Sequence, residues 1–184
     1  MFRLIAFLRA INVGRGRTVK MESLRRVFES LGFRRVATFI ASGNVIFESR
    51  LKRTRTLERK IEKALHDALG YEVRIFVRTE AELTRIANYR PFSQSKLDTR
   101  WQCNIIFLAD NLTPALKRNV KALRTKTDMF EPRGREIYWL RRRKQNSALF
   151  SSIPLERTLG EAFTVRGADT IKRIASKWCS PDTR

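Results

Sequence analysis

A short loop near the start of the chain has the residue types that bind anions. The segment LRAINVGRG at 8–16 turns within a few residues from an apolar run into arginine, asparagine and glycine. Glycine lets a ligand approach the backbone closely. A helix is expected just after the loop, where unpaired N–H groups and the helix dipole favour an anion. The segment therefore predicts a phosphate or carboxylate site, with the candidate residues Arg9, Asn12, Gly14, Arg15 and Gly16.

A second candidate is the tripeptide Ser42, Gly43, Asn44, which lies between two strand-like runs. Its composition is also that of a tight hairpin turn, and the first loop is equally consistent with a turn that needs glycine backbone angles. Both interpretations, turn and binding site, stay open at this point. Neither segment matches the GxGxxG or GxxxxGK[ST] pattern, so the sequence does not indicate a nucleotide in particular.

The sequence predicts no catalytic residue, no metal site and no cofactor. The one histidine, His66, is expected on the polar side of a helix, where a solvated role is more common than a general base. The aspartates lack the spacing of paired acids or metal ligands, and Cys103 and Cys179 do not form a CxxC motif. Whether the protein is an enzyme is left open by the sequence.

The chain of 184 residues is strongly basic, with a formal net charge of +21. A hydrophobic content of 42%, with 12 Phe and 3 Trp, indicates a folded globular protein and not a disordered tail. A field of this sign attracts polyanions, nucleic acid above all, through counterion release; the alternative is a residue-usage bias on a solvated surface. The charge is spread along the chain and includes two clusters. One is Arg50, Lys52, Arg53, Arg55, Arg59, Lys60 and Lys63, and the other is Arg141, Arg142, Arg143 and Lys144.

No window approaches the roughly 18 consecutive apolar residues that cross a bilayer. The first residues lead straight into a strand-like run without a leader pattern. A cytoplasmic protein without membrane contact is therefore expected.

Hydrophobic periodicity predicts an α+β fold. The first half is expected to follow the βαββαβ order of a ferredoxin-like split βαβ unit, an antiparallel sheet with its helices on one face. Its two helices are expected to begin at Thr18 and Thr56. The capping pair Thr79 and Glu82 is expected to begin a short helix after the first half. The second half is expected to repeat strand, helix capped by Thr113 and two strands, and then to close with a helix. We predict two ferredoxin-like subdomains, 1–79 and 101–184, joined by a helix and linker at 80–100.

The sheet face turned away from the helices is predicted to be basic and partly aromatic. Because strand side chains alternate, Arg3 and Phe7 of the first strand share this face with Arg74, Phe76 and Arg78 of the last. Such a face suits RNA, with bases stacked on phenylalanine and phosphates held by arginine. The alternative is that the second half packs over the face and buries its apolar residues.

Several of these segments together resemble a bacterial family called domain of unknown function 1697. The resemblance is carried by LRAINVGRG at 8–16, Leu31-Gly32-Phe33, IASGNVIF at 40–47, Pro91 with Phe92, and Thr164 with Arg166. It implies two ferredoxin-like subdomains, adds Thr164 and Arg166 to the binding candidates, and implies no established biochemical role. The positions that depart from the family pattern are Ala10, Arg15, Gly167 and Ala168.

The sequence thus favours an anion-binding module with nucleic acid as the leading partner class. A second hypothesis is a protein or enzyme that binds a phosphate- or carboxylate-bearing small molecule between the subdomains. A protein-interaction scaffold is the third.

Overall fold

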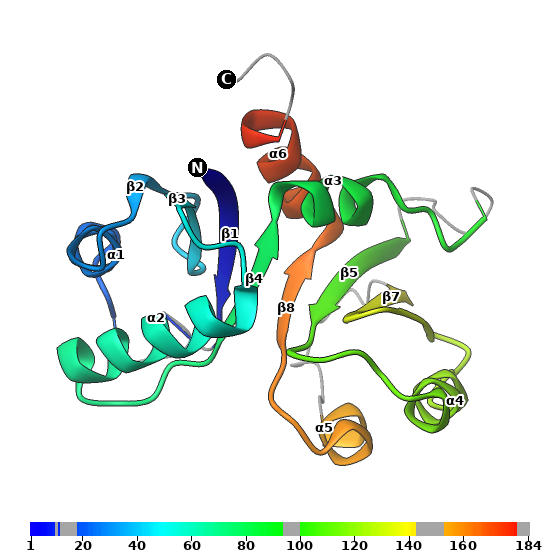
Figure 1. Cartoon of the computed structure of the whole chain (residues 1–184). Helices are drawn as coiled ribbons and strands as arrows, with labels where there is room; N and C mark the ends of the chain where they lie inside the picture. Colours follow the sequence, from blue (N-terminus) through cyan, green and yellow to red (C-terminus); the bar gives the residue numbers. More distant parts are fainter. Residues whose placement is uncertain (10, 12–17, 94–99, 143–152, 180–184) are drawn as a thin grey trace. The chain divides into compact units, whose positions relative to one another are not determined.

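A computed structural model of the chain describes residues 1–9, 11, 18–93, 100–142 and 153–179. These residues group into two units (Figure 1). Unit 1 contains Met1–Asn88 and Ile171–Arg184, and unit 2 contains Tyr89–Thr170. Compared with the subdomains expected from the sequence, residues 80–88 and the C-terminal segment are grouped with the first unit.

Unit 1 has the predicted βαββαβ order, followed by a third helix and by most of the C-terminal helix. Its sheet has the strand order β2-β3-β1-β4, and every neighbouring pair is antiparallel. This is the order of a split βαβ unit, in which each helix connects two strands that have a third strand between them. The elements are β1 (Phe2–Leu8), α1 (Met21–Ser30), β2 (Arg34–Thr38), β3 (Asn44–Ser49), α2 (Thr54–Leu69), β4 (Ile75–Thr79), α3 (Glu80–Asn88) and α6 (Ala168–Trp178).

One face of this sheet forms a hydrophobic core with α1 and α2, as the alternation of the strands predicts. Leu4, Ala6 and Leu8 of β1 lie in that core, and three aromatic rings, Phe28, Phe33 and Phe47, pack within it. The helix starts differ from the prediction. Lys20 and Arg53 occupy the N-cap positions without a side-chain cap, because core packing, and not threonine capping, determines where these helices begin.

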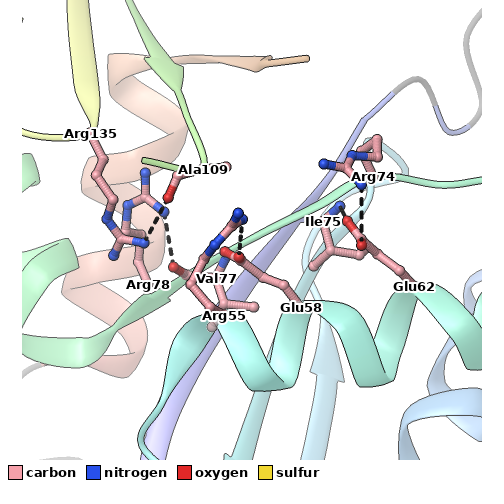
Figure 2. A network of polar contacts seen from close by, with 9 residues as sticks. All are labelled: Arg55, Glu58, Glu62, Arg74, Ile75, Val77, Arg78, Ala109 and Arg135. Carbon is pink, nitrogen blue, oxygen red and sulfur yellow. Dashed lines mark hydrogen bonds and ion pairs between the residues drawn. The ribbon is translucent and has the colours of Figure 1, made fainter. Parts of the chain in front are cut away.

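The outer edge of β4 is covered by glutamate side chains. The N–H groups of Ile75, Val77 and Thr79 alternate along this edge and donate to Glu62, Glu58 and Glu82, at 3.0, 2.8 and 2.8 Å. Figure 2 shows the first two contacts, which reach β4 from one side of α2. The third belongs to the predicted Thr79–Glu82 capping box, which is confirmed. Edge strands that remain open invite pairing with another chain, and this one is closed by its own unit.

Glu58 is the most buried of these carboxylates, with 1% of its surface exposed. Burial raises the pKa of Glu58 above its ordinary value, and the bonds from the Val77 N–H and from Arg55 act in the opposite direction. Arg55 lies 3.0 Å from the Glu58 carboxylate (Figure 2). The carboxylate is therefore desolvated but held by two donors.

Unit 2 repeats the topology of unit 1. Its sheet has the order β6-β7-β5-β8, again antiparallel throughout, with α4 and α5 packed into the core on one face. The predicted Thr113 cap of α4 is confirmed, because its side chain accepts from the Leu116 N–H at 3.2 Å. Helix α5 and strand β8 were not predicted. The elements are β5 (Trp101–Phe107), α4 (Pro114–Ala122), β6 (Asp128–Arg133), β7 (Glu136–Arg142), α5 (Ile153–Leu159) and β8 (Thr164–Gly167).

The structure therefore shows the predicted α+β class, with two ferredoxin-like βαββαβ units. Across the described ranges, no helix is both long and apolar enough to span a bilayer.

Candidate nucleic-acid interface

The first predicted loop falls mostly outside the described residues. Asn12, Gly14, Arg15 and Gly16 lie there, so their role stays a prediction. Arg9 is half-buried, and its backbone N–H donates to the Arg74 carbonyl at 2.9 Å, which extends the pairing of β1 with the segment before β4.

The tripeptide at 42–44 is part of the turn between β2 and β3. Asn44 is fully buried, and its side-chain N–H groups donate to the Phe39 carbonyl and to Ser42 Oγ, both at 2.9 Å. Gly43 has φ +72°, and a Cβ there would lie 2.3 Å from Ile11 Cγ2. Its carbonyl also accepts from the Leu8 N–H at 2.9 Å. The two segments that carry the family resemblance therefore pack against each other, and Gly43 is required for their close approach.

Thr164 and Arg166 both lie in β8 and are buried. The Arg166 guanidinium donates to Thr164 Oγ1 and to the Val165 carbonyl, each at 2.8 Å, and burial lowers the pKa of Arg166 to about 10. Arg166 stands opposite Ile105 in the pairing of β8 with β5. These two candidates are structural neighbours within unit 2.

The prediction that one sheet face of unit 1 binds RNA is contradicted by the burial of most of its residues. Phe7 and Phe76 are 0% and 2% exposed, and Arg78 is 0% exposed, so none of the three is presented to a base or a phosphate. Arg78 donates to the Val77 carbonyl. Arg74 is exposed but lies 3.5 Å from Glu62, and Arg3 is largely buried beside Glu48. Strand alternation places these side chains on one face of the sheet, and the two aromatic rings of that face are buried.

The exposed basic residues of unit 1 gather instead around the end of β3 and the start of α2. Every basic residue between positions 31 and 61 is exposed, whereas the two acidic residues of that segment, Glu48 and Glu58, turn inward. We call the residues that line the hollows of this region the β3–α2 basic surface: Arg34, Arg35, Arg50, Lys52, Arg53 and Lys60.

Arg35 reaches this surface from an irregular backbone. It has φ +47°, and the register of β2 against β3 shifts between Arg34 and Ala37. A bulge of this kind re-aims a side chain, and a non-glycine residue with positive φ is strained. The guanidinium lies 3.6 Å from Glu48 and is 71% exposed. The irregularity therefore brings an additional cation to the basic surface.

Two hollows lie within this surface. The larger, of about 1270 Å³, is lined by Arg3, Arg35, Lys52 and Arg53, by the exposed ring of Phe2, and by part of α3. The smaller, of about 260 Å³, is lined by Arg34, Arg50 and Lys60, and the two share Met1. Glu48, Glu80 and Glu82 also line the larger hollow, so basic residues predominate there without being alone, whereas no acidic residue is among the described residues that line the smaller hollow. The exposed apolar side chains of Met1, Phe2 and Leu51 lie at the border of the two hollows.

The larger hollow also contains a thiol, that of Cys179. Burial raises the pKa of the Cys179 thiol to about 11, which keeps it protonated and poorly nucleophilic at neutral pH. His66 is exposed on α2, as predicted. Within the described ranges, no group of three or more His, Cys, Asp or Glu residues is arranged to hold a metal ion.

Sequence reasoning found part of this site. The sequence shows the cluster from Arg50 to Lys60 as a run of basic residues, whereas the sequence prediction does not include Arg34 and Arg35. The signal for them would have been the hairpin itself, since strand pairing brings β2 alongside the end of β3.

Taken together, two βαββαβ units and a basic concave surface define a two-unit ferredoxin-like α+β protein. The family model for a protein of unknown function (DUF1697) matches residues 1–138 of the 184, and the chain belongs to that family. No biochemical role is established for it.

A solved structure of a conserved bacterial protein from Streptococcus pneumoniae is similar in fold. It has a TM-score of 0.70 and 21% sequence identity, and the match covers 95% of this chain and 97% of that one. No curated protein matches the chain.

Proposed function

We propose that the protein binds a polyanion, with nucleic acid as the leading class, through the β3–α2 basic surface. The observation that carries this proposal is the sorting of charge between positions 31 and 61, where every basic side chain is exposed, Glu58 is buried, and Glu48 is largely buried at the wall of the larger hollow. A random solvated surface interleaves the two signs. Here Glu48 forms ion pairs with Arg3 and Arg35. Glu58 forms an ion pair with Arg55 and accepts a hydrogen bond from the Val77 N–H at the edge of β4.

The expected energetics follow from the charge. Each phosphate neutralised by a lysine or arginine releases condensed counterions, so affinity falls steeply as salt rises. The exposed Phe2 ring, with Lys52 5.6 Å from its centroid, adds an aromatic contact at the rim of the larger hollow. A cytoplasmic location, expected from the sequence, would place the protein among nucleic acids.

The size of the larger hollow supports a second candidate, a phosphate- or carboxylate-bearing small molecule. A volume of about 1270 Å³ leaves room for a ligand of this kind. Arginine side chains suit such groups because a guanidinium binds two oxygens at once. Arg35 and Arg53, which line the hollow, are the residues proposed to hold them.

The test is binding of a labelled DNA duplex and an oligothymidylate at low salt, followed through a salt titration. We expect log K to fall linearly with log salt, by about 0.9 per duplex phosphate contacted and about 0.7 per single-strand phosphate. No binding at low salt contradicts the polyanion proposal. Thermal stabilisation by pyrophosphate that is lost in Arg35→Ala would favour the small-molecule candidate.

A further inference from the structure

An aromatic and basic patch lies beside the larger hollow of unit 1. Phe39, which follows β2, meets Trp178 at the end of α6, with ring centroids 5.4 Å apart and an edge-on angle of 80°. Both rings are partly exposed. The patch borders the hollow, because Arg3 donates to the Trp178 carbonyl and both Arg3 and Cys179 line that hollow.

Two cations accompany the rings. The Arg173 guanidinium lies 5.0 Å from the centroid of Phe39, and the Lys177 ammonium lies 4.6 Å from that of Trp178. Arg173 and Lys177 are exposed residues of α6. Single-stranded nucleic-acid sites combine aromatic rings, on which bases stack, with neighbouring arginine and lysine residues that contact the phosphates.

The backbone of the turn fixes the position of Phe39. The Phe39 N–H donates to the Asn44 carbonyl at 3.0 Å, and the Asn44 side chain donates back to the Phe39 carbonyl at 2.9 Å. The buried Asn44 of the family signature thus holds the residue whose ring forms half of the pair. Asn44 would therefore contribute to a site by fixing the position of Phe39, and not by contacting a ligand.

Strain is concentrated at the next residue. Ile40 has φ +50°, an unusual conformation for a β-branched residue, and its apolar side chain is 46% exposed. Strained backbone persists where surrounding structure over-determines it, and such positions cluster at ligand contacts. Exposed apolar surface, such as Ile40 beside the two aromatic rings, also often marks a binding site.

We propose that Phe39, Ile40 and Trp178, with Arg173 and Lys177, form a platform on which bases of a single-stranded nucleic acid stack. This inference rests on the proposed function, since the β3–α2 basic surface supplies the phosphate contacts. It adds the class of nucleic acid: strands with unpaired bases are bound in preference to duplexes. Stacking is tolerant of sequence because every base has a π face.

The experiment compares two probes of equal length and charge, an oligothymidylate of about twelve nucleotides and an abasic strand. Wild-type protein is compared with Trp178→Leu, which keeps an apolar side chain but removes the aromatic face, and with the conservative Trp178→Phe. Phe39→Leu is a second variant on the other ring. Circular dichroism and the Tm report whether each variant folds.

We expect Trp178→Leu and Phe39→Leu each to weaken oligothymidylate binding about tenfold, the size expected for loss of one stacked base. Binding of the abasic strand stays unchanged, and Trp178→Phe restores most of the affinity. If the leucine variants bind both probes as wild type does, the stacking platform is refuted while the basic surface stands. If wild type binds neither probe at low salt, the proposed function fails first.

Discussion

The hairpins β2–β3 and β6–β7 occupy the same place in the two units but differ in regularity. In unit 2, β6 and β7 pair without interruption from Asp128 to Arg133, and Gly134 supplies the positive φ of the turn. In unit 1, the register shifts within β2. Arg35 and Ile40 are the non-glycine residues with positive φ in the described part of the chain, and both lie in this hairpin region. The topology permits a relaxed hairpin, so the strain in unit 1 is a property of its sequence.

Other features are shared by the two units. Arg78 on β4 stands opposite Ile5, and Arg166 on β8 stands opposite Ile105, so each sheet carries a buried arginine at an equivalent position. Arginine is rarely buried this completely. The repeated feature points to a requirement of the scaffold, whereas the irregular hairpin and its basic surface distinguish unit 1. We infer that the repeated arginines stabilise the fold, and the proposed binding site lies where the two units differ.

The largest effect is expected from alanine at the turn glycines. Gly43→Ala places a methyl group 2.3 Å from Ile11 Cγ2 and 3.0 Å from Leu8 Cβ, at φ +72°. Overpacking and backbone strain together should lower the free energy of unfolding by about 3 kcal/mol. Gly134→Ala at φ +62° meets atoms only at 3.7 Å and should cost about 1 kcal/mol. Urea denaturation measures both, and equal losses would contradict the packing role given to Gly43.

A smaller loss is expected at the covered edge of β4. Glu58→Ala leaves the buried Val77 N–H without its acceptor, which should cost about 2 kcal/mol. Glu58→Gln keeps an acceptor oxygen and should stay within about 1 kcal/mol of wild type. A loss in Glu58→Gln as large as that in Glu58→Ala would mean that the charge, and not the acceptor, matters.

The difference in stability between wild type and Glu58→Gln should depend on pH in a direction that follows from the Glu58 pKa. The pKa of Glu58 is raised in the folded state, so folding favours its protonated form. The destabilisation by the buried charge is present above the folded pKa and disappears as pH falls below the unfolded value near 4.5. Stability of Glu58→Gln relative to wild type should therefore be greater at neutral pH than at acidic pH. An unchanged difference across that range would contradict the raised pKa.

The smallest effect is a gain at Ile40. Ile40→Gly removes the side chain from a strained φ of +50° and should raise the free energy of unfolding by about 1 kcal/mol. Ile40→Ala is the matched control, because it removes the exposed side chain beyond Cβ but keeps the Cβ that causes the strain. Thermal denaturation should show a higher Tm for the glycine variant alone. Equal Tm values for both variants would mean that the hairpin stores no strain.

Much of the scaffold was predictable because local signals agreed with the final packing. Alternating residues in β1 placed Leu4 and Leu8 under the helices, and the Thr79 and Thr113 caps have the expected hydrogen bonds. The sequence does not predict strand β8, because its four residues include arginine and glycine and show no clear hydrophobic alternation. The Arg166 side chain bonds to its neighbours Thr164 and Val165, but the strand that contains it forms only by pairing with the distant β5, which no local pattern predicts.

The site was less predictable for a physical reason. Alternation states which side of a strand Phe7 and Phe76 occupy but not whether that side is covered. The strain at Arg35 arises from a register shift, which depends on how β2 meets β3 and not on the residues of β2 alone. The basic cluster after β3 was visible in the sequence; its concave form was not.

The most direct test of the comparison is the salt dependence of oligothymidylate binding in two triple variants. The unit 1 variant combines Arg35→Ala, Lys52→Ala and Arg53→Ala, and the unit 2 control removes three exposed charges, Arg118, Arg124 and Lys126, in the same way. We expect the slope of log K against log salt to become shallower by about 2 in the unit 1 variant, because each single-strand phosphate that is neutralised in the wild type adds about 0.7 to the slope. In the control we expect no change of slope. Equal changes in both variants would contradict the assignment of binding to the β3–α2 basic surface.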